Sequence, residues 1–233
     1  MAALKLTNVS YSVDGAPLLH DISFMQENKG VNAILGPNGA GKSLLLSLIH
    51  GVIKPDMGLV TWNGISAQRN KLTRGYVFQT PIVLRRSVRA NLAYPLTLTR
   101  ENTQDQKRAI DEMLKLSHLA PLADQPAASL SGGEAQRMAI ARALITKPAV
   151  LLLDEPCSNL DPASTKLIEA MIRTFISDGG SVFISTHDLA QAKRLADVVL
   201  FIEAGQLLEH GPADEFFAKP ATPQAQAYLS GDL

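Results

Sequence analysis

Cysteine is almost absent from this 233-residue sequence, whose single cysteine is Cys157. A lone cysteine excludes an internal disulfide and a cysteine-based zinc site, which fits a reducing compartment. We expect Cys157 itself to be a small core residue, because its neighbours are apolar. No apolar run approaches the ~18 residues that a spanning helix requires, and the N-terminal stretch MAALKLTNVS lacks the pattern of a secretory leader. The sequence therefore predicts a soluble, cytoplasmic chain.

An excess of charge of one sign is also lacking, since 22 Lys and Arg residues balance 22 Asp and Glu residues. Without a global basic field, nucleic acid is not an expected partner, although local basic patches remain possible. Hydrophobic residues make up 46% of the sequence and charged residues 19%, so the chain is too apolar to be disordered and should fold. The length allows one large domain or two small ones, and composition does not distinguish them.

The stretch GPNGAGKS, residues 36–43, matches the G-x-x-x-x-G-K-[ST] pattern of a phosphate-binding loop. It lies between a short apolar run at 31–35, typical of a buried strand, and a run of helical density at 44–49. In that setting the glycines let backbone N–H groups surround a polyphosphate at a helix N-terminus. Lys42 would contact the β- and γ-phosphates, and the Ser43 hydroxyl would bind Mg²⁺. The alternative is a glycine-rich loop with only a structural role.

Apolar periodicity and turn signals predict the other elements. Strands are predicted over 4–13, 18–24, 59–62, 75–78, 150–153, 181–185, 198–203 and 206–210, and helices over 87–94, 101–116, 162–177 and 188–196. The strands before residue 80, with turns at Asp14-Gly15 and Asn63-Gly64, indicate a small antiparallel sheet that includes 75–78. Later strands alternate with helices, which indicates a mostly parallel sheet. Residues 80–130 are predicted to be a helical insertion, and the tail from Pro220 to be polar and mobile.

An acidic pair closes the predicted strand at 150–153. Asp154 stands at the C-terminal end of that strand, where an open α/β sheet forms its ligand crevice, so it is placed to bind Mg²⁺. Glu155 follows directly and points to the opposite side, because successive strand side chains alternate, so it can act on an attacking water. The alternative is a solvated strand end that happens to have two acids.

A second candidate anion site lies in LSGGEAQ, residues 130–136. The Ser131 hydroxyl and the Gly132-Gly133 pair open a predicted helix that runs to Leu144, and a helix N-terminus attracts anions. A chain rarely needs two phosphate cradles for one nucleotide.

Taken together and in this order, the motifs resemble the ATP-binding cassette of ABC transporters over nearly the whole chain. The corresponding motifs are GPNGAGKS (Walker A), Gln79 (Q-loop), LSGGE (signature), VLLLDEP (Walker B), SNLD at 158–161 (D-loop) and His187 in STHD (switch). The signature between Walker A and Walker B separates this family from P-loop kinases and GTPases. Two positions depart from the family pattern: Glu134 replaces a commoner glutamine, and Cys157 stands where threonine is frequent.

The resemblance implies an α/β P-loop NTPase fold, a mostly parallel sheet flanked by helices with an antiparallel β subdomain. It also implies a single ABC ATPase domain over 1–233 with a helical subdomain at about 80–145, which binds ATP and Mg²⁺. The implied catalytic residues are Glu155, His187 and Gln79, and the implied Mg²⁺ ligands are Ser43, Gln79 and Asp154. The implied nucleotide contacts are Tyr11, Gly36, Pro37, Asn38, Gly39, Ala40, Gly41, Lys42 and Ser43, with Ser131, Gly132, Gly133 and Asp161 acting across a dimer interface. Tyr11 would stack on adenine, or else is an ordinary strand aromatic.

Members of this family pair head to tail around ATP, so the resemblance implies a homodimer of cassettes. It further implies integral membrane permease subunits, a solute-binding protein, and a position on the inner face of the membrane. Residues 80–95 lie where a permease helix docks; Arg85, Arg86 and Arg89 would contact it, or else form a solvated basic face. The apolar stripe of Leu84, Val88 and Leu92 is either core or groove lining.

Residues 78–95 resemble the corresponding segment of oxyanion importers of the tungstate or phosphate kind. This resemblance implies that the cargo is a small oxyanion. The alternative function is a soluble ABC-type ATPase of DNA repair, chromosome organisation or ribosome work, or a cassette of another membrane complex. The short interval between Ser43 and Ser131 leaves no room for the long coiled coil of repair and chromosome proteins.

Overall fold

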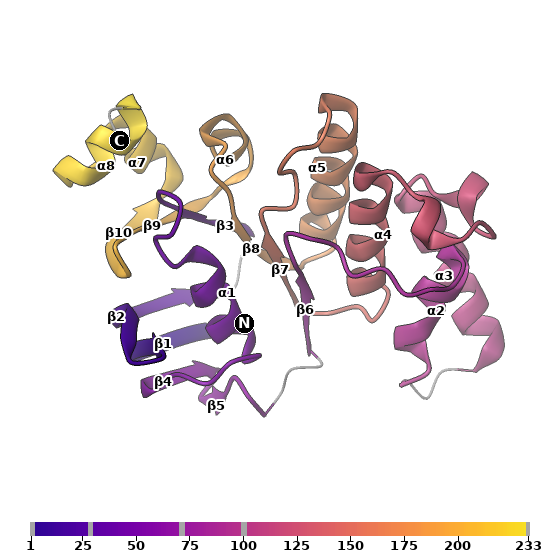
Figure 1. The fold of residues 1–233 in the computed structure, drawn as a ribbon, viewed down its shortest axis with the longest axis horizontal. Coiled ribbons are helices and arrows are strands. Elements are labelled where there is room, and N and C mark those ends of the chain that lie inside the picture. The colour runs from indigo at the N-terminus through magenta and orange to yellow at the C-terminus, as the bar shows by residue number, and fades with distance from the viewer. Residues whose placement is uncertain (1–2, 28–29, 70–72, 99–101, 232–233) are drawn as a thin grey trace.

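The computed structural model describes residues 3–27, 30–69, 73–98 and 102–231, which form two sheets and the helices packed on them (Figure 1). The expected helix at 101–116 begins at Thr103 within this part of the chain, and Glu101 lies outside the described residues. None of the helices in these ranges combines the length and the apolarity needed to cross a bilayer.

The first sheet has four antiparallel strands in the order β2-β1-β4-β5. Its strands are β1 (Ala3–Val13), β2 (Ala16–Glu27), β4 (Met57–Trp62) and β5 (Ile65–Ser66). Asp14-Gly15 and Asn63-Gly64 join β1 to β2 and β4 to β5, and both residues of each pair have positive φ. Tight hairpin turns of this kind match the strand twist, so the predicted antiparallel sheet is confirmed.

The second sheet has six strands in the order β10-β9-β3-β8-β7-β6. Its strands are β3 (Gly30–Leu35), β6 (Arg74–Val77), β7 (Val150–Asp154), β8 (Ser181–Ser185), β9 (Val198–Glu203) and β10 (Gln206–Pro212). All pairs are parallel except the hairpin of β9 and β10. The predicted mostly parallel sheet is therefore confirmed.

The assignment of residues 75–78 to the antiparallel sheet is wrong. β6 pairs with β7 in parallel, with Arg74 opposite Val150 and Val77 opposite Leu153. No hairpin turn ties so short a strand to a sequence neighbour, so its place depends on a partner far along the chain. Because β6 lies beside β7, the residues that follow it are delivered to the same sheet edge as Asp154.

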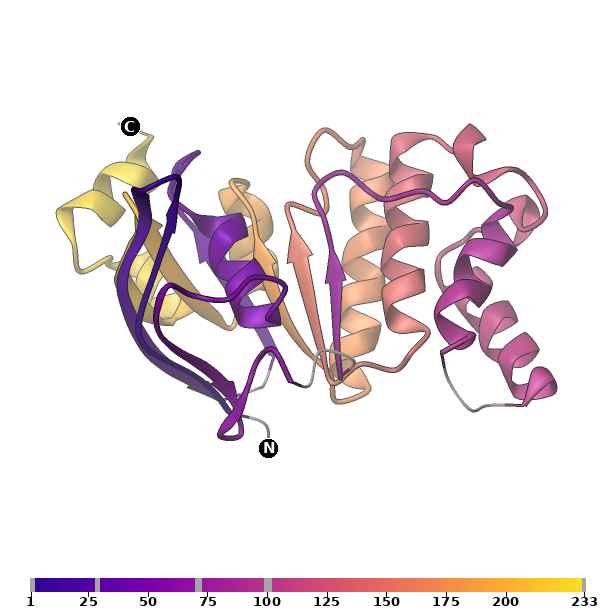
Figure 2. The same cartoon turned by 60° about the horizontal axis from the view of Figure 1, so that its bottom comes forward.

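The helices cover both faces of the six-stranded sheet. They are α1 (Lys42–His50), α2 (Val88–Leu96), α3 (Thr103–Leu116), α4 (Gly132–Leu144), α5 (Pro162–Ser177), α6 (Leu189–Leu195), α7 (Ala213–Ala218) and α8 (Pro223–Ser230), with short 3-10 turns at Ala120–Leu122 and Ala127–Ser129. Figure 2 shows the antiparallel sheet curving around α1, whereas α4 and α5 stand on the other side and α2 and α3 lie outermost. Of these elements, α2, α3 and the two 3-10 turns occupy the helical insertion predicted at residues 80–130.

The predicted mobile tail is instead the helix α8. The Thr222 side chain accepts a hydrogen bond from the N–H of Ala225, and Ala225 is fully buried. The Tyr228 ring packs on Phe201 of β9 with centroids 5.3 Å apart. A helix this short gains most of its stability from tertiary packing, which a polar sequence segment does not reveal.

Alternating side chains of β7 explain why its sequence, VLLLD, is apolar throughout. Leu151 and Leu153 pack in one core with α4 and α5, whereas Val150 and Leu152 pack in another with α1 and the antiparallel sheet. Both faces are covered, and each buried leucine contributes roughly 1.5–3 kcal/mol of transfer free energy. The strand is thereby fixed in place, and Asp154 is held at its end.

Candidate functional site

Lys42 is the first residue of α1 and its side chain turns back into the loop that precedes the helix. Its Nζ donates hydrogen bonds to the carbonyl oxygens of Gly36 at 2.8 Å and Pro37 at 2.9 Å. Burial lowers the pKa of Lys42, while the negative charges of Glu155 and Asp154 oppose that effect. The loop thus encloses a cation at the end of β3, beside the N-terminus of a helix, which is the arrangement that binds polyphosphates.

Gly36 begins this loop in a conformation that L side chains rarely adopt, with φ 147°. A Cβ at this position would lie 1.9 Å from the carbonyl oxygen of Ile202, which belongs to the neighbouring strand β9. The loop therefore passes closer to the sheet than any other residue type allows.

We expect Gly36→Ala to destabilise the fold by about 3 kcal/mol or more, because backbone strain adds to a clash with a backbone atom. Gly39→Ala is the matched control: its φ is also positive, but a Cβ there meets nothing within 4 Å, so about 1–2 kcal/mol is expected. Thermal unfolding would show the difference as a midpoint lower by several degrees for Gly36→Ala than for Gly39→Ala. Equal midpoints would mean that the loop relaxes freely.

Asp154 brings two hydroxyl groups together at the end of β7. Its Oδ1 accepts hydrogen bonds from Ser43 Oγ at 2.9 Å and Ser185 Oγ at 2.6 Å. Asp154 is buried, with only 6% of the residue exposed, and these contacts orient its carboxylate. A hydroxyl and a carboxylate side by side offer the hard oxygen ligands that Mg²⁺ prefers, and the residues present fit that ion.

Glu155 turns away from the strand in the left-handed region, with φ 43°, a conformation that costs about 1–3 kcal/mol and recurs at functional sites. Its N–H donates to the backbone oxygen of Ser185 at 3.1 Å and to Ser185 Oγ at 3.0 Å, which stabilises the turn. The Oε2 atom accepts from Gln79 Nε2 at 3.0 Å and lies 3.2 Å from His187 Nδ1. Three segments distant in sequence therefore meet at one carboxylate oxygen.

A cavity of about 530 Å³ joins these groups. Of the sequence-predicted residues, those that line it are Asn38, Gly39, Gly41, Lys42, Ser43, Gln79, Glu155 and His187. Asp154, Gly36 and Pro37 connect to it through their hydrogen bonds to Ser43 and Lys42. Ala40, within the loop itself, is buried.

The remaining predicted residues do not line this cavity. Ser131 caps α4: its side chain donates to Glu134 Oε2 at 2.7 Å, and its backbone N–H donates to the same oxygen at 2.8 Å. These hydrogen bonds lower the pKa of Glu134, so the departure from the family's glutamine places a carboxylate at this helix N-terminus. Asp161 caps α5 by accepting from Ala163 and Ser164. Tyr11 is a partly buried residue of β1, and its ring packs against the core that the antiparallel sheet shares with α1.

Among the residues of the site that sequence reasoning missed are two serines, Ser185 and Ser158. Ser185 orients both acids, through Asp154 Oδ1 and the Glu155 backbone, and a hydroxyl at the end of a fully buried strand was the available signal. Ser158 lines the cavity next to Glu155. Cys157, expected in the core, is partly buried and packs against it, and burial raises the pKa of its thiol to about 11.

A glycine-rich loop with an enclosed lysine, placed between a parallel strand and a helix and facing an acidic strand end, defines a P-loop NTPase. A family model described as ABC transporter matches residues 19–158, more than half of the chain. The phosphate import ATP-binding protein PstB 2 of Natronomonas pharaonis is 36% identical over 99% of this chain and 87% of its own. The tungstate uptake system ATP-binding protein TupC of Peptoclostridium acidaminophilum is 37% identical over 92% of this chain and 99% of its own.

Solved structures agree with these relatives. The cbiO1 protein from Clostridium perfringens, described as part of an ABC transporter complex, superposes with a TM-score of 0.82 at 29% identity over 93% of this chain and 90% of its own. An ATP binding subunit of an ABC transporter, 22% identical, shares the fold with a TM-score of 0.85 over 99% of both chains. The chain therefore belongs to the ABC transporter family, and it is an ATP-binding subunit with ATPase activity.

Proposed function

We propose that this chain binds ATP together with Mg²⁺, and that hydrolysis of the ATP powers import of a small anionic solute through a separate membrane permease. The observation that best supports the hydrolytic part is the meeting of Lys42, the Ser43–Asp154 pair and Glu155 at one cavity. The imported solute class is proposed from the phosphate and tungstate import relatives. The chain would act as one ABC ATPase domain over 1–233, with its helical subdomain at about 80–145.

The phosphate loop is proposed to hold ATP by residues 36–43, with the Lys42 ammonium moving from its carbonyl partners to the β- and γ-phosphates. Ser43 and Asp154 would hold Mg²⁺, with Gln79 nearby as a further ligand. When bound, the ion neutralises charge on the phosphate oxygens during phosphoryl transfer. Tyr11 would stack on the adenine ring from the antiparallel sheet.

Glu155 is the proposed general base, because its carboxylate faces the cavity and is only 12% exposed. Its Oε2 would take the proton of the attacking water as the water oxygen bonds to the γ-phosphorus, while the bond from that phosphorus to the β,γ-bridging oxygen breaks and ADP leaves with its electron pair. Gln79 and His187 already contact that same oxygen, so they would position the base, and His187 would also contact the γ-phosphate. Those contacts must loosen before a water can reach Oε2.

Residues 131–133 lie outside the cavity, which supports a site shared between two copies of the chain. In a head-to-tail homodimer, Ser131, Gly132 and Gly133 of one protomer would contact the γ-phosphate held by the other, with Asp161 at the interface. ATP would then stabilise the dimer, and hydrolysis would release it.

We expect Glu155→Gln protein to run as a dimer with ATP by light scattering and as a monomer without ATP. Adding Ser131→Arg should return it to monomer, because a long cation would fill the space meant for the γ-phosphate. Ser177→Arg, exposed at the far end of α5, is the matched control and should leave the dimer intact. A dimer that forms without ATP and persists in the Ser131→Arg variant would contradict the shared site.

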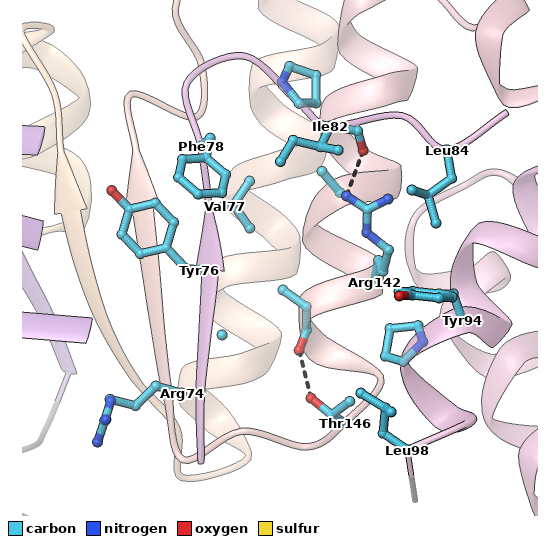
Figure 3. A pocket seen from close by; sticks show the side chains of 15 residues that line it. Arg74, Tyr76, Val77, Phe78, Ile82, Leu84, Tyr94, Leu98, Arg142 and Thr146 are labelled. Carbon is cyan, nitrogen blue, oxygen red and sulfur yellow. Dashed lines mark hydrogen bonds between the residues drawn. The ribbon is translucent and has the colours of Figure 1, made fainter. Parts of the chain in front are cut away.

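An apolar groove beside the Q-loop is the proposed permease contact (Figure 3). It encloses about 360 Å³ between β6, α2 and α4, and Phe78, Ile82, Tyr94 and Leu98 leave 41%, 54%, 47% and 76% of their surfaces exposed around it. Exposed apolar clusters of this kind mark interaction sites.

The residues predicted for docking lie in different surroundings: some are in the core, one lines the groove, and the arginines are either paired or exposed. Val88 and Leu92 are fully buried, so of the expected apolar stripe only Leu84 lines the groove. Arg89 pairs with Asp111 at 2.7 Å and Asp124 at 3.5 Å, so it is engaged within the helical region. Arg85 and Arg86 are exposed, and the Cζ atom of Arg86 lies 5.5 Å from the centroid of the Tyr94 ring. Both arginines therefore remain candidates for permease contact.

Recovery from native membranes tests the transport assignment. The tagged chain is expected to co-purify with an integral membrane protein, on the inner face of the membrane, and the ATPase rate of the complex should rise with phosphate or tungstate presented by a solute-binding protein. Chloride at equal ionic strength is the control. Recovery of DNA or ribosomes without any integral membrane protein would favour the soluble ATPase function instead.

A further inference from the structure

The last part of the chain contacts the phosphate loop from the side of the parallel sheet. Gly205, in the turn between β9 and β10, donates its N–H to the carbonyl oxygen of Ala40 at 3.2 Å. The carbonyl oxygen of Ile202 in β9 lies where a Cβ at Gly36 would stand. Figure 1 shows α7 and α8 beside β9 and β10. A side chain of these helices that reaches past β9 can therefore contact the start of the loop.

Tyr228 of α8 is such a side chain. Its ring packs on Phe201 with centroids 5.3 Å apart, and Phe201 lies opposite Leu35, the residue before the loop. The side chain as a whole is partly exposed, but its hydroxyl oxygen is buried. Burial raises the pKa of Tyr228, the backbone N–H of Gly36 lowers it, and the negative charge of Glu155 raises it. The hydroxyl therefore faces the first residue of the phosphate loop.

This hydroxyl is incompletely satisfied. Within the part of the chain that the structure describes, no group forms a hydrogen bond of normal geometry with its oxygen, although the Gly36 N–H approaches it. A buried hydroxyl without a full hydrogen bond is costly. Lys42 holds the Gly36 carbonyl at 2.8 Å, and the proposed move of Lys42 to the phosphates would release that carbonyl. The release gives Gly36 the freedom to bring its N–H onto the hydroxyl oxygen.

The helix that carries Tyr228 is fastened to the sheet, so the adjustment falls to the loop. Thr222 caps α8 and donates from its N–H and its hydroxyl to Glu209 Oε1 of β10, at 2.7 Å and 2.6 Å. Ala225, in the first turn of the helix, is fully buried. These contacts hold the ring of Tyr228 in place beside β9.

We infer that Tyr228 is a positioning residue of the nucleotide site: when a nucleotide occupies the phosphate loop, the Gly36 N–H completes its hydrogen bond to the Tyr228 hydroxyl. The inference rests on the proposed binding of ATP by residues 36–43 and adds the C-terminal helix to that site. Because coupling between two sites is reciprocal, a bound nucleotide would also hold α8 more firmly on the sheet. The helix thereby helps to set the affinity for ATP without touching the nucleotide.

The decisive experiment compares the full chain with its Tyr228→Phe variant, which keeps the ring on Phe201 and removes only the hydroxyl. ADP with Mg²⁺ is the probe, because it is not hydrolysed and lacks the γ-phosphate of the proposed shared site. We expect the variant to bind ADP about 3–10-fold more weakly by isothermal titration, which is the loss of one hydrogen bond. Without nucleotide, its unfolding midpoint should equal or exceed that of the wild type, because an incompletely satisfied buried hydroxyl is gone. A purely structural role of the hydroxyl predicts the reverse: a lower midpoint and an unchanged affinity.

Hydrogen exchange of single amides, followed by NMR, gives the second measurement. ADP is expected to slow exchange of the Gly36 amide in the wild type and not in Tyr228→Phe, while the Gly39 amide should be protected in both proteins. Gln224→Ala, exposed on the same helix, is the matched control and should behave as the wild type in both measurements.

Equal ADP affinity of wild type and Tyr228→Phe, or equal protection of the Gly36 amide in the two proteins, overturns this inference and leaves the proposed function standing. A Tyr228→Phe variant that melts well below the wild type without nucleotide also overturns it. If the wild-type chain bound no ADP, the proposed nucleotide site would fail as well.

Discussion

Glu155→Gln is expected to lower the rate of ATP hydrolysis by about 10²–10⁴-fold, the usual contribution of a general base, while ATP remains bound. The amide has the same shape and keeps polar contacts with Gln79 and His187, but it does not accept the proton of the attacking water. The rate of hydrolysis and the affinity for ATP should change independently, because ATP binding depends on the phosphate loop, whose backbone and Lys42 are unchanged. Single-turnover phosphate release and equilibrium ATP binding measure them.

Glu112→Gln is the matched control for this substitution. Glu112 lies on the surface of α3, where its side chain is 58% exposed and pairs with Arg108, so hydrolysis should be unaffected. If Glu155→Gln turned over ATP at the wild-type rate, another group would be the base, and the hydrogen bonds around Oε2 would have only a structural role.

Lys42→Ala is expected to weaken ATP binding by about 10–100-fold, because a charge-assisted hydrogen bond to the phosphates is worth about 1.5–3 kcal/mol. The loss should be larger for ATP than for AMP, since the proposed contacts are with the β- and γ-phosphates. Isothermal titration with both nucleotides measures the difference.

The control for the lysine substitution is Lys54→Ala, an exposed lysine outside the cavity, which should bind ATP as the wild type does. Because Lys42 also binds Gly36 and Pro37, a thermal melt of Lys42→Ala is needed to separate a loosened loop from a lost phosphate contact. A folded variant with wild-type affinity for ATP would contradict the phosphate-loop assignment.

Several elements of the fold could be predicted because their causes are local. Asp14-Gly15 and Asn63-Gly64 adopt positive φ and form the hairpins that such pairs favour. β7 is apolar along its length, which is what a strand covered on both faces requires. The position of β6 was not predictable in this way, because four residues pair equally well with any strand edge and its neighbour β7 follows far later in the sequence.

The sequence by itself determined the phosphate loop, the acidic strand end and their common reaction, since residues contiguous in the chain supply the chemistry of each motif. Tertiary structure alone decided which distant groups meet: Ser185 with both acids, Gln79 and His187 at one oxygen of Glu155, and Arg142 with Ile82 across 60 residues. It also placed α8 on the sheet, a helix too short to hold without that surface. Local conformation is fixed by neighbouring residues, whereas a contact between distant segments depends on the packing of every element that lies between them.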